Sequence, residues 1–540
     1  MDQLGEAKFI AQLAASLGRE FDIDLLHKLA PERPQTVLRS LGQLKDAGLL
    51  EMVGATGCQF RHTLIQEAAY QSQTRADRQA AHRQIARVLQ SDYPDRVAAR
   101  PELLAQHLSS AGDVRASIAW WIRAGQRAIR GSANLEAIAH FNGAIRLLMA
   151  LPAAPDRDQL ELSILVGLSP ALHATQGYGS DEATRVTARV GALRQALSDS
   201  AETFQAEWTR LRNTLATRGP RGVPQAAKQL LELAADDPIG QQAAHYVAAI
   251  ATFWLGEFEA SRVQATQALR LYRPEHHPMM LERFGEDLSV SFAGHLSWSL
   301  CFLGFPDQAH AECGRMFKQA RAMAHPKTLA MALLFASMQA RWLNQYAQTL
   351  SLSTEVVAVT RQHGMSHWTG TGVALCAWAR SLRGDQEDVA GLQAMADSLR
   401  TASPAYTTIH LLGLAEMHMH LKRFDLAQGL LVQAQEAESS TGSCQFGAET
   451  HRLRGVCQLG LVPSDAGAAE ASFGLALALS RRQGAKTLEL RAATSMARLW
   501  RQQGKQDQAL RLLATTHAWF TEGLDAPDLV EAAELLRALG

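Results

Sequence analysis

The chain has 540 residues, of which 47% are hydrophobic, so it exceeds the usual length of one compact domain and can bury a large core. Its 53 Lys and Arg residues balance 53 Asp and Glu residues, which excludes a strong overall field toward nucleic acid or an anionic membrane. No stretch reaches the ~18 apolar residues of a membrane helix, the 6 cysteines form no Cys-x-x-Cys pair, and Met1–Glu6 lacks the start of a signal peptide. We therefore expect a cytoplasmic protein with free, buried thiols and no membrane contact.

Residues 1–95 predict a small domain of their own. Helices are expected over Ala7–Leu17, closed by Gly18, over Phe21–Ala30 and over Gln35–Ala47. Two short strands, joined by a glycine-rich turn, are expected over Leu49–Val53 and Cys58–Arg61. Three helices followed by a strand hairpin predict a winged-helix domain, and no comparable strand signal occurs later in the chain.

From about residue 100 onward a helical spacing of apolar residues dominates. Between residues 150 and 225 the pattern is looser and is interrupted by residues such as Pro152, Pro170 and Pro220, so a bend is expected there. Residues 96–235 as a whole are expected to form irregular TPR-like hairpins.

Residues 236–540 carry a turn that recurs at close to 40-residue spacing. In each copy an apolar helix ends at a glycine-like position and a new helix with an early alanine begins, as in Leu255–Ala260 and Gln503–Ala509. The turn positions are 256, 304, 344, 384, 422, 460 and 504, with glycine at five of them and Asn344 and Lys422 at the others. Such a period indicates stacked helical hairpins, which a final helix over Ala526–Leu539 would cap.

These hairpins resemble tetratricopeptide (TPR) repeats, although most copies exceed the usual ~34 residues. HEAT-type repeats have a similar period and are the alternative, but the turn of Gly-x-Phe/Tyr-x-x-Ala type favours TPR. The predicted fold is all-α: a right-handed TPR-like helical-hairpin superhelix (an α-solenoid) with a small N-terminal winged-helix domain.

Five segments resemble a family of large bacterial signalling proteins. In that family a class III nucleotide cyclase, or a protein kinase, precedes a STAND-type P-loop ATPase, a winged helix and a long TPR-like array. The segments are Leu17–Phe21, Phe60–Tyr70, Phe253–Phe258, Glu489–Trp500 and Trp519–Gly523. The chain lacks the Gly-x-x-x-x-Gly-Lys-Ser/Thr loop that cradles phosphates, and the predicted winged helix leaves no room for a cyclase before it. The resemblance therefore implies the regulatory half alone, as a truncated or split gene product without enzymatic activity.

The resemblance also implies a nucleotide-sensing role for Arg61 and His62. In STAND ATPases a histidine near the end of the winged helix contacts a phosphate of bound ADP, and Arg61-His62-Thr63-Leu64 resembles that motif. An imidazole N–H can donate to a phosphate oxygen, and an arginine beside it adds positive charge. Because the chain has no P-loop, the alternative is that His62 caps or orients the following helix.

Other site chemistry is weakly supported. The adjacent His276 and His277, and the spread His410, His418 and His420, do not have metal-ligand spacing. No Gly-x-Ser-x-Gly motif or Cys–His pair is present. Accordingly, no catalytic residue, metal or cofactor is expected. The tryptophans could line a ligand groove, but core packing explains them better; they are Trp120, Trp121, Trp208, Trp254, Trp298, Trp342, Trp368, Trp378, Trp500 and Trp519.

The sequence thus predicts a non-catalytic TPR-repeat module for protein–protein interaction or sensing. A protein partner is expected on the concave surface, with a P-loop ATPase or a nucleotide cyclase as candidates, and a small-molecule effector in the groove is a variant of the same idea. The alternative is a winged-helix DNA-binding transcriptional regulator that reads bases through Gln35, Thr36, Arg39, Ser40, Gln43 and Lys45. The neutral charge argues against nucleic acid.

Overall fold

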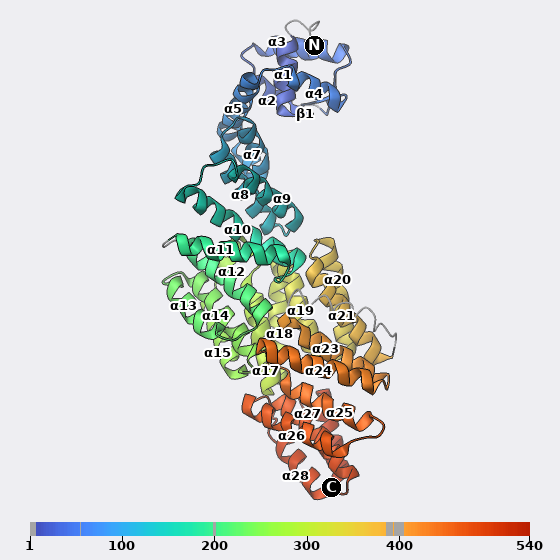
Figure 1. The fold of residues 1–540 in the computed structure, drawn as a ribbon. Coiled ribbons are helices and arrows are strands. Elements are labelled where there is room, and N and C mark those ends of the chain that lie inside the picture. The colour runs from blue at the N-terminus through green and yellow to red at the C-terminus, as the bar shows by residue number, and fades with distance from the viewer. Residues whose placement is uncertain (1–6, 55, 198–200, 385–392, 394–403) are drawn as a thin grey trace. The chain divides into compact units, whose positions relative to one another are not determined.

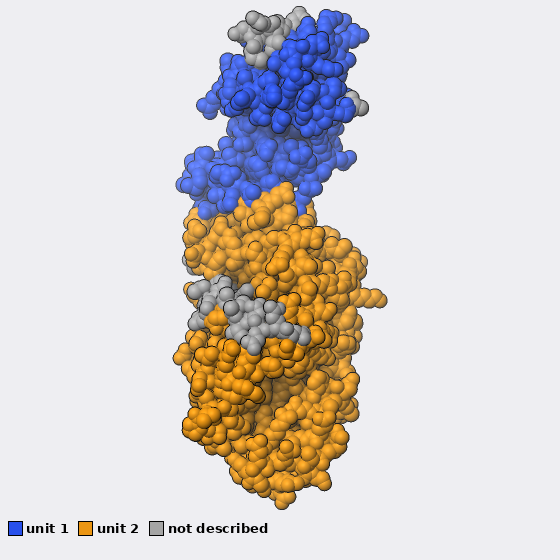
Figure 2. Space-filling model, turned by 90° about the vertical axis from the view of Figure 1, so that its right-hand side faces the viewer, with its two compact units in different colours: residues 1–127, 139–164 blue, residues 128–138, 165–540 orange. Residues whose placement is uncertain are grey.

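The computed structural model describes residues 7–54, 56–197, 201–384, 393 and 404–540. The chain divides into two compact units (Figure 2). Unit 1 comprises residues 1–127 and 139–164, and unit 2 comprises residues 128–138 and 165–540. The predicted division at residues 95 and 235 stays a prediction.

Unit 1 begins with a helix–strand–helix–helix–strand–strand segment, which helices follow. Its elements are α1 (Ala7–Leu17), β1 (Glu20–Asp22), α2 (Ile23–Leu29), α3 (Pro34–Asp46), β2 (Leu50–Val53), β3 (Gly57–Phe60), α4 (Thr63–Gln71), α5 (Arg75–Asp92), α6 (Pro94–Ala99) and α7 (Pro101–Ser110). Three further helices have residues in both units: α8 (Val114–Arg130), α9 (Asn134–Leu148) and α10 (Pro155–Gln176). Buried apolar side chains from α1 to α7 form one core.

The three strands pair antiparallel in the order β1–β3–β2. The two predicted strands are present, whereas β1 was not predicted and corrects the helix expected from Phe21. Phe21 pairs with Cys58 in the sheet and is buried. The helix begins only at Ile23 because Asp22 Oδ1 accepts a hydrogen bond from Asp24 N at 2.8 Å and so caps its first turn.

Every described element that lies wholly within unit 2 is a helix. These helices form hairpins, and unit 2 is a TPR-like α-solenoid (Figure 1). The helices are α11 (Asp181–Ala196), α12 (Ala201–Arg218), α13 (Val223–Ala234), α14 (Pro238–Trp254), α15 (Phe258–Leu271), α16 (His277–Phe284), α17 (Leu288–Leu303), α18 (Pro306–Met323), α19 (Pro326–Trp342), α20 (Tyr346–Gln362), α21 (Ser366–Arg383), α23 (Pro404–His420), α24 (Phe424–Thr441), α25 (Gly447–Gly460), α26 (Ala466–Gln483), α27 (Lys486–Gln502), α28 (Gln506–His517) and α29 (Pro527–Leu539), with a short 3-10 turn over Pro274–His276.

The recurring turn is confirmed at six of its seven predicted positions. Gly256, Gly304, Gly384 and Gly504 have left-handed backbones, and so do the non-glycine residues Asn344 and Lys422, with φ of 55° and 59°. The prediction for residue 460 is wrong, because Gly460 is the last residue of α25 rather than a turn residue. A Cβ there would lie 2.3 Å from the Phe424 ring, so this glycine allows close packing. Two residues of the predicted turn at 384, at positions 385 and 386, lie outside the described residues.

The hairpins form two layers of helices. The first helix of a hairpin is buried more fully than the second, most clearly in α19, where 15 of 17 residues are buried, against 4 of 17 in its partner α20. The first helices of successive hairpins also contact one another: α14 contacts α17, α17 contacts α19, and α25 contacts α27. We call α14, α17, α19, α21, α23, α25 and α27 the inner layer, because both the second helices and the neighbouring hairpins cover them.

The C-terminal ends of early helices contact segments that lie much later in the chain. The Cys444 backbone N–H donates to the Trp254 carbonyl at 2.8 Å, and the Thr487 hydroxyl donates to the Cys301 carbonyl at 2.6 Å. At Gly219 the close approach of Thr441 leaves no space for a Cβ, which would lie 2.1 Å from the Thr441 carbonyl oxygen. The stack therefore curls so that inner helices distant in sequence meet.

All six cysteines are free, and four of them are buried, as expected. Among the described residues, no helix is long and apolar enough to cross a membrane.

Candidate functional site

Arg61 and His62 follow β3 directly and are exposed on unit 1. The Arg61 backbone N–H donates to the Leu49 carbonyl at 3.1 Å, which holds the residue beside the start of β2. His62 is the N-cap residue of α4, but only its backbone carbonyl serves the helix, and its side chain makes no capping hydrogen bond. The imidazole therefore forms no hydrogen bond that caps the start of the helix, and the nucleotide-sensing role stays a prediction.

Helix α3, the predicted DNA-reading helix, exposes Gln35, Arg39, Gln43 and Lys45, whereas Ser40 is buried. A buried hydroxyl cannot read a base edge, so Ser40 is removed from the predicted set of base contacts.

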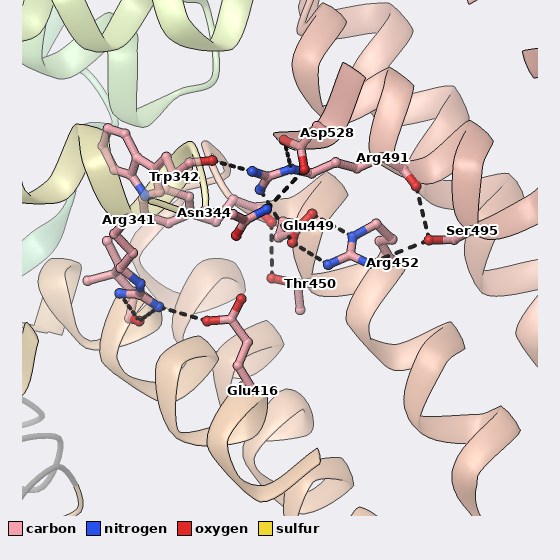
Figure 3. A network of polar contacts seen from close by, with 12 residues as sticks. Arg341, Trp342, Asn344, Glu416, Glu449, Thr450, Arg452, Arg491, Ser495 and Asp528 are labelled. Carbon is pink, nitrogen blue, oxygen red and sulfur yellow. Dashed lines mark hydrogen bonds and ion pairs between the residues drawn. The ribbon is translucent and has the colours of Figure 1, made fainter. Parts of the chain in front are cut away.

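A network of charged side chains lies on the inner layer of unit 2 (Figure 3). Its members come from α19, the turn after α19, α23, α25, α27 and α29, so five inner or capping helices contribute to one place. Arg341 on α19 donates to Glu416 on α23 at 3.2 Å, and its guanidinium lies 4.9 Å from the Trp378 ring centroid. The Trp378 indole N–H donates to the same Glu416 carboxylate at 2.8 Å.

The centre of the network is the pair of α25 and α27. Arg452 holds Glu449 by two hydrogen bonds, of 2.9 Å from Nε and 2.6 Å from Nη2. Arg491 Nη1 lies 3.7 Å from Glu449 Oε1, and Arg491 Nε donates to Asp528 on α29 at 2.7 Å. Arg491 also donates to the Trp342 carbonyl, and Asn344 donates to Asp528 at 2.9 Å.

These contacts explain how Glu449 stays charged although it is buried. Burial by itself opposes ionisation of Glu449, but the charges of Arg452 and Arg491 and the hydrogen bonds from Arg452 outweigh it and lower the pKa of Glu449 to about 2. Asp528 in turn raises the pKa of Arg491, against the opposing effect of burial. Glu449 and Arg491 are therefore both ionised at neutral pH.

Beside the network lies a polar hollow of about 360 Å³, which we call the charged hollow. Its charged lining residues are Lys422, Arg452, Arg491, Arg498, Glu416, Glu449, Asp528 and Glu531. The pairs at its centre are buried, whereas Arg498 and Glu531 form an ion pair with side chains 51% and 41% exposed. The hollow thus offers charges of both signs, fixed at the centre and accessible at the rim.

No group of three or more potential metal-ligating side chains gathers within the part of the chain that the structure describes. His277 is instead bound to Asp287, 2.7 Å away. Sequence reasoning did not find the charged hollow, because its members are separated by up to about 190 residues and no local motif joins them.

No family model matches the chain. An uncharacterized protein of Rhizobium meliloti (strain 1021) is 26% identical over 514 residues, which cover 92% of this chain and 49% of that protein, so the chain spans about half the length of this curated relative. Similar solved structures include the APC/C hetero-tetramer Cut9–Hcn1 (14% identity, 88% of this chain and 94% of that chain, TM-score 0.46). A second is a Rap protein complexed with competence and sporulation factor (11% identity, 78% of this chain and 99% of that chain, TM-score 0.41). A third is a STAND protein with a tetratricopeptide repeat sensor from Pyrococcus horikoshii (13% identity, 100% of this chain and 66% of that chain, TM-score 0.27).

Proposed function

We propose that this chain is a non-catalytic recognition module that binds a segment of a partner protein in the charged hollow. The observation that carries the proposal is the convergence of eight charged side chains from α23, the turn after it, α25, α27 and α29 on one hollow of about 360 Å³. Charged groups are rarely placed inside a helical stack unless they are paired or used, because desolvating them costs free energy. A polar protein segment with both acidic and basic side chains complements such a surface.

The accessible rim supplies the specificity in this proposal. Arg498 and Glu531 are about half exposed, so partner side chains can compete for them at little cost in stability. The buried pairs of Glu449, Arg452, Arg491 and Asp528 keep the hollow in shape.

The test exchanges the charges of one rim pair. The double variant Arg498→Glu/Glu531→Arg keeps an ion pair and therefore the fold. It exchanges the positions of the positive and negative charges that a partner would contact. The matched control is Glu259→Arg/Arg262→Glu, which exchanges an exposed pair on the second-layer helix α15. Pull-downs with the full chain are expected to recover a P-loop ATPase or a nucleotide cyclase with wild type and control, and to lose it with the rim variant. Equal recovery with both variants would contradict the proposal.

We further infer that the chain is the regulatory part of a signalling ATPase or nucleotide-cyclase system, with its N-terminal segment acting as a winged helix. Three observations support this inference. The five segments resemble the signalling family, the helices and strands of residues 7–60 follow the order expected for a winged helix, and the chain aligns with about half the length of the curated relative. Binding-dependent repacking of the helices would pass the signal to the catalytic partner.

In this system Arg61 and His62 would face the phosphate of a nucleotide, since both side chains are exposed. Calorimetry with ADP, on the chain alone and on the chain with its recovered partner, is expected to give binding that His62→Ala weakens. Unchanged affinity in His62→Ala would remove the sensing role.

A further inference from the structure

A second hollow, distinct from the charged hollow, lies among the inner helices and is lined mainly by aromatic side chains. Its volume is about 100 Å³, and its walls come from α12, α14, α17, α19, α21 and α23 and from the residues just before α25. The aromatic walls include Tyr246, Phe253, Trp254, Trp298, Trp342 and Tyr406. We call it the aromatic cavity. Four of the tryptophans assigned to the core thus border one partly open cavity, namely Trp254, Trp298, Trp342 and Trp368.

One permanently charged side chain, Arg212 of α12, lines this cavity. The residue is 6% exposed. Its Nη2 donates to the Tyr178 hydroxyl at 3.0 Å, and its guanidinium lies 5.1 Å and 5.2 Å from the ring centroids of Tyr178 and Tyr246. Aromatic faces stabilise a cation only in part compared with a carboxylate.

No carboxylate among the described residues forms an ion pair with Arg212. Glu286, whose charge acts on Tyr246, is buried and is already paired with Lys327 at 3.3 Å. Arg212 therefore has no anionic partner among the described residues, and tyrosine side chains alone offset the burial of its charge.

Three residues of the cavity wall also have buried polar atoms without a hydrogen-bond partner. They are Arg212 Nε, Trp368 Nε1 and Gln445 Oε1. Two of these are N–H donors, and the Gln445 amide can turn to present its own N–H group. Buried polar groups are nearly always satisfied, so donors gathered on one cavity indicate an acceptor that occupies it.

The histidines of the wall do not supply further charge. Burial lowers the pKa of His295 and of His410 to about 3 and that of His367 to about 4, so all three are neutral at pH 7. The cavity therefore offers a single cation, neutral donors and aromatic walls.

We propose that the aromatic cavity binds a small aromatic carboxylate of about the size of benzoate, with Arg212 as its counter-ion. An apolar cavity of about 150 Å³ holds benzene. This cavity of about 100 Å³ is partly open to the surface, so it takes a single ring only with one edge of the ring at the opening. The carboxylate accepts from Arg212 Nε and the ring lies between the aromatic walls. This site needs no protein segment in the charged hollow.

The test uses benzoate and its neutral counterpart benzamide as probes of the full chain. Binding is followed through quenching of the cavity tryptophans and through the rise in Tm. Wild type is expected to bind benzoate at least about tenfold more tightly than benzamide, because a charge-assisted hydrogen bond replaces a neutral one. Arg212→Met is expected to lose this preference while still binding benzamide, which shows that the variant is folded.

The matched control is Arg218→Met, an exposed arginine on the same helix. It is expected to keep the wild-type preference for benzoate. Equal affinity of the wild type for the two probes, binding of neither probe at millimolar concentration, or an unchanged preference in Arg212→Met would each overturn the proposal. The wild-type ratio decides the question even if Arg212→Met does not fold.

Discussion

Replacing Arg491 by alanine is expected to lower the free energy of unfolding by about 3–5 kcal/mol, the usual cost of breaking a buried ion pair from one side. The Arg491 side chain is 12% exposed and contacts Asp528, Glu449 and the Trp342 carbonyl. Its loss leaves Asp528 with only Asn344 as a described hydrogen-bond donor. Urea unfolding of the full chain measures the effect, and limited proteolysis should show release of α29.

The control for this prediction lies two turns later on the same helix. Arg498 pairs with Glu531 in an exposed position, so Arg498→Ala is expected to cost about 0–1 kcal/mol. If the two variants unfold at similar urea concentrations, Arg491 does not hold the network together as described.

Glu438 is expected to make the stability depend on pH with a sign opposite to that of an ordinary carboxylate. Burial raises the pKa of Glu438 from 4.5 to about 7, and a hydrogen bond of 2.9 Å from the Thr450 hydroxyl opposes this only in part. Because the folded pKa exceeds the unfolded one, the folded chain binds this proton more tightly. The resulting stability is fully present below about pH 4.5 and is lost as the pH rises through about 7.

The size of the effect follows from the same shift, which corresponds to about 3 kcal/mol. Glu438→Gln is expected to be as stable as wild type near pH 5 and more stable by up to about 3 kcal/mol near pH 8. The control is Glu436→Gln, an exposed carboxylate on the same helix, which should not change the profile.

Urea midpoints of the three proteins across this pH range give the test. Buried histidines such as His295, with a pKa lowered to about 3, contribute stability that is present above about pH 6.5 and lost as the pH falls. They are common to all three proteins, so the difference between wild type and Glu438→Gln isolates Glu438. A difference that does not grow between pH 5 and pH 8 would rule out the raised pKa.

Much of the fold follows from local patterns in the sequence. Gly256, Gly304 and Gly504 could be assigned to left-handed turns because the apolar spacing stops there and restarts with a new phase. Gly460 carried the same signal for a different reason, namely contact with Phe424. A single sequence does not distinguish a glycine that is needed for its backbone angle from one that is needed for close packing.

The sites could not be predicted in the same way. Arg491 and Trp342 are 149 positions apart, and their contact depends on how far the stack of hairpins curls. Arg212 looks like any arginine on a helix until the burial of its surroundings is known. Local motifs indicated Arg61 and His62 instead, on the strength of a family resemblance.

In the proposed function, the inner layer of unit 2 is the recognition surface. Hydrogen exchange of the backbone, with and without the P-loop ATPase or nucleotide cyclase recovered by the full chain, tests it most directly. The prediction is protection of the inner helices α23, α25 and α27 around the charged hollow, lost in Arg498→Glu/Glu531→Arg. Protection confined to second-layer helices such as α20, α24 and α26 would contradict the account.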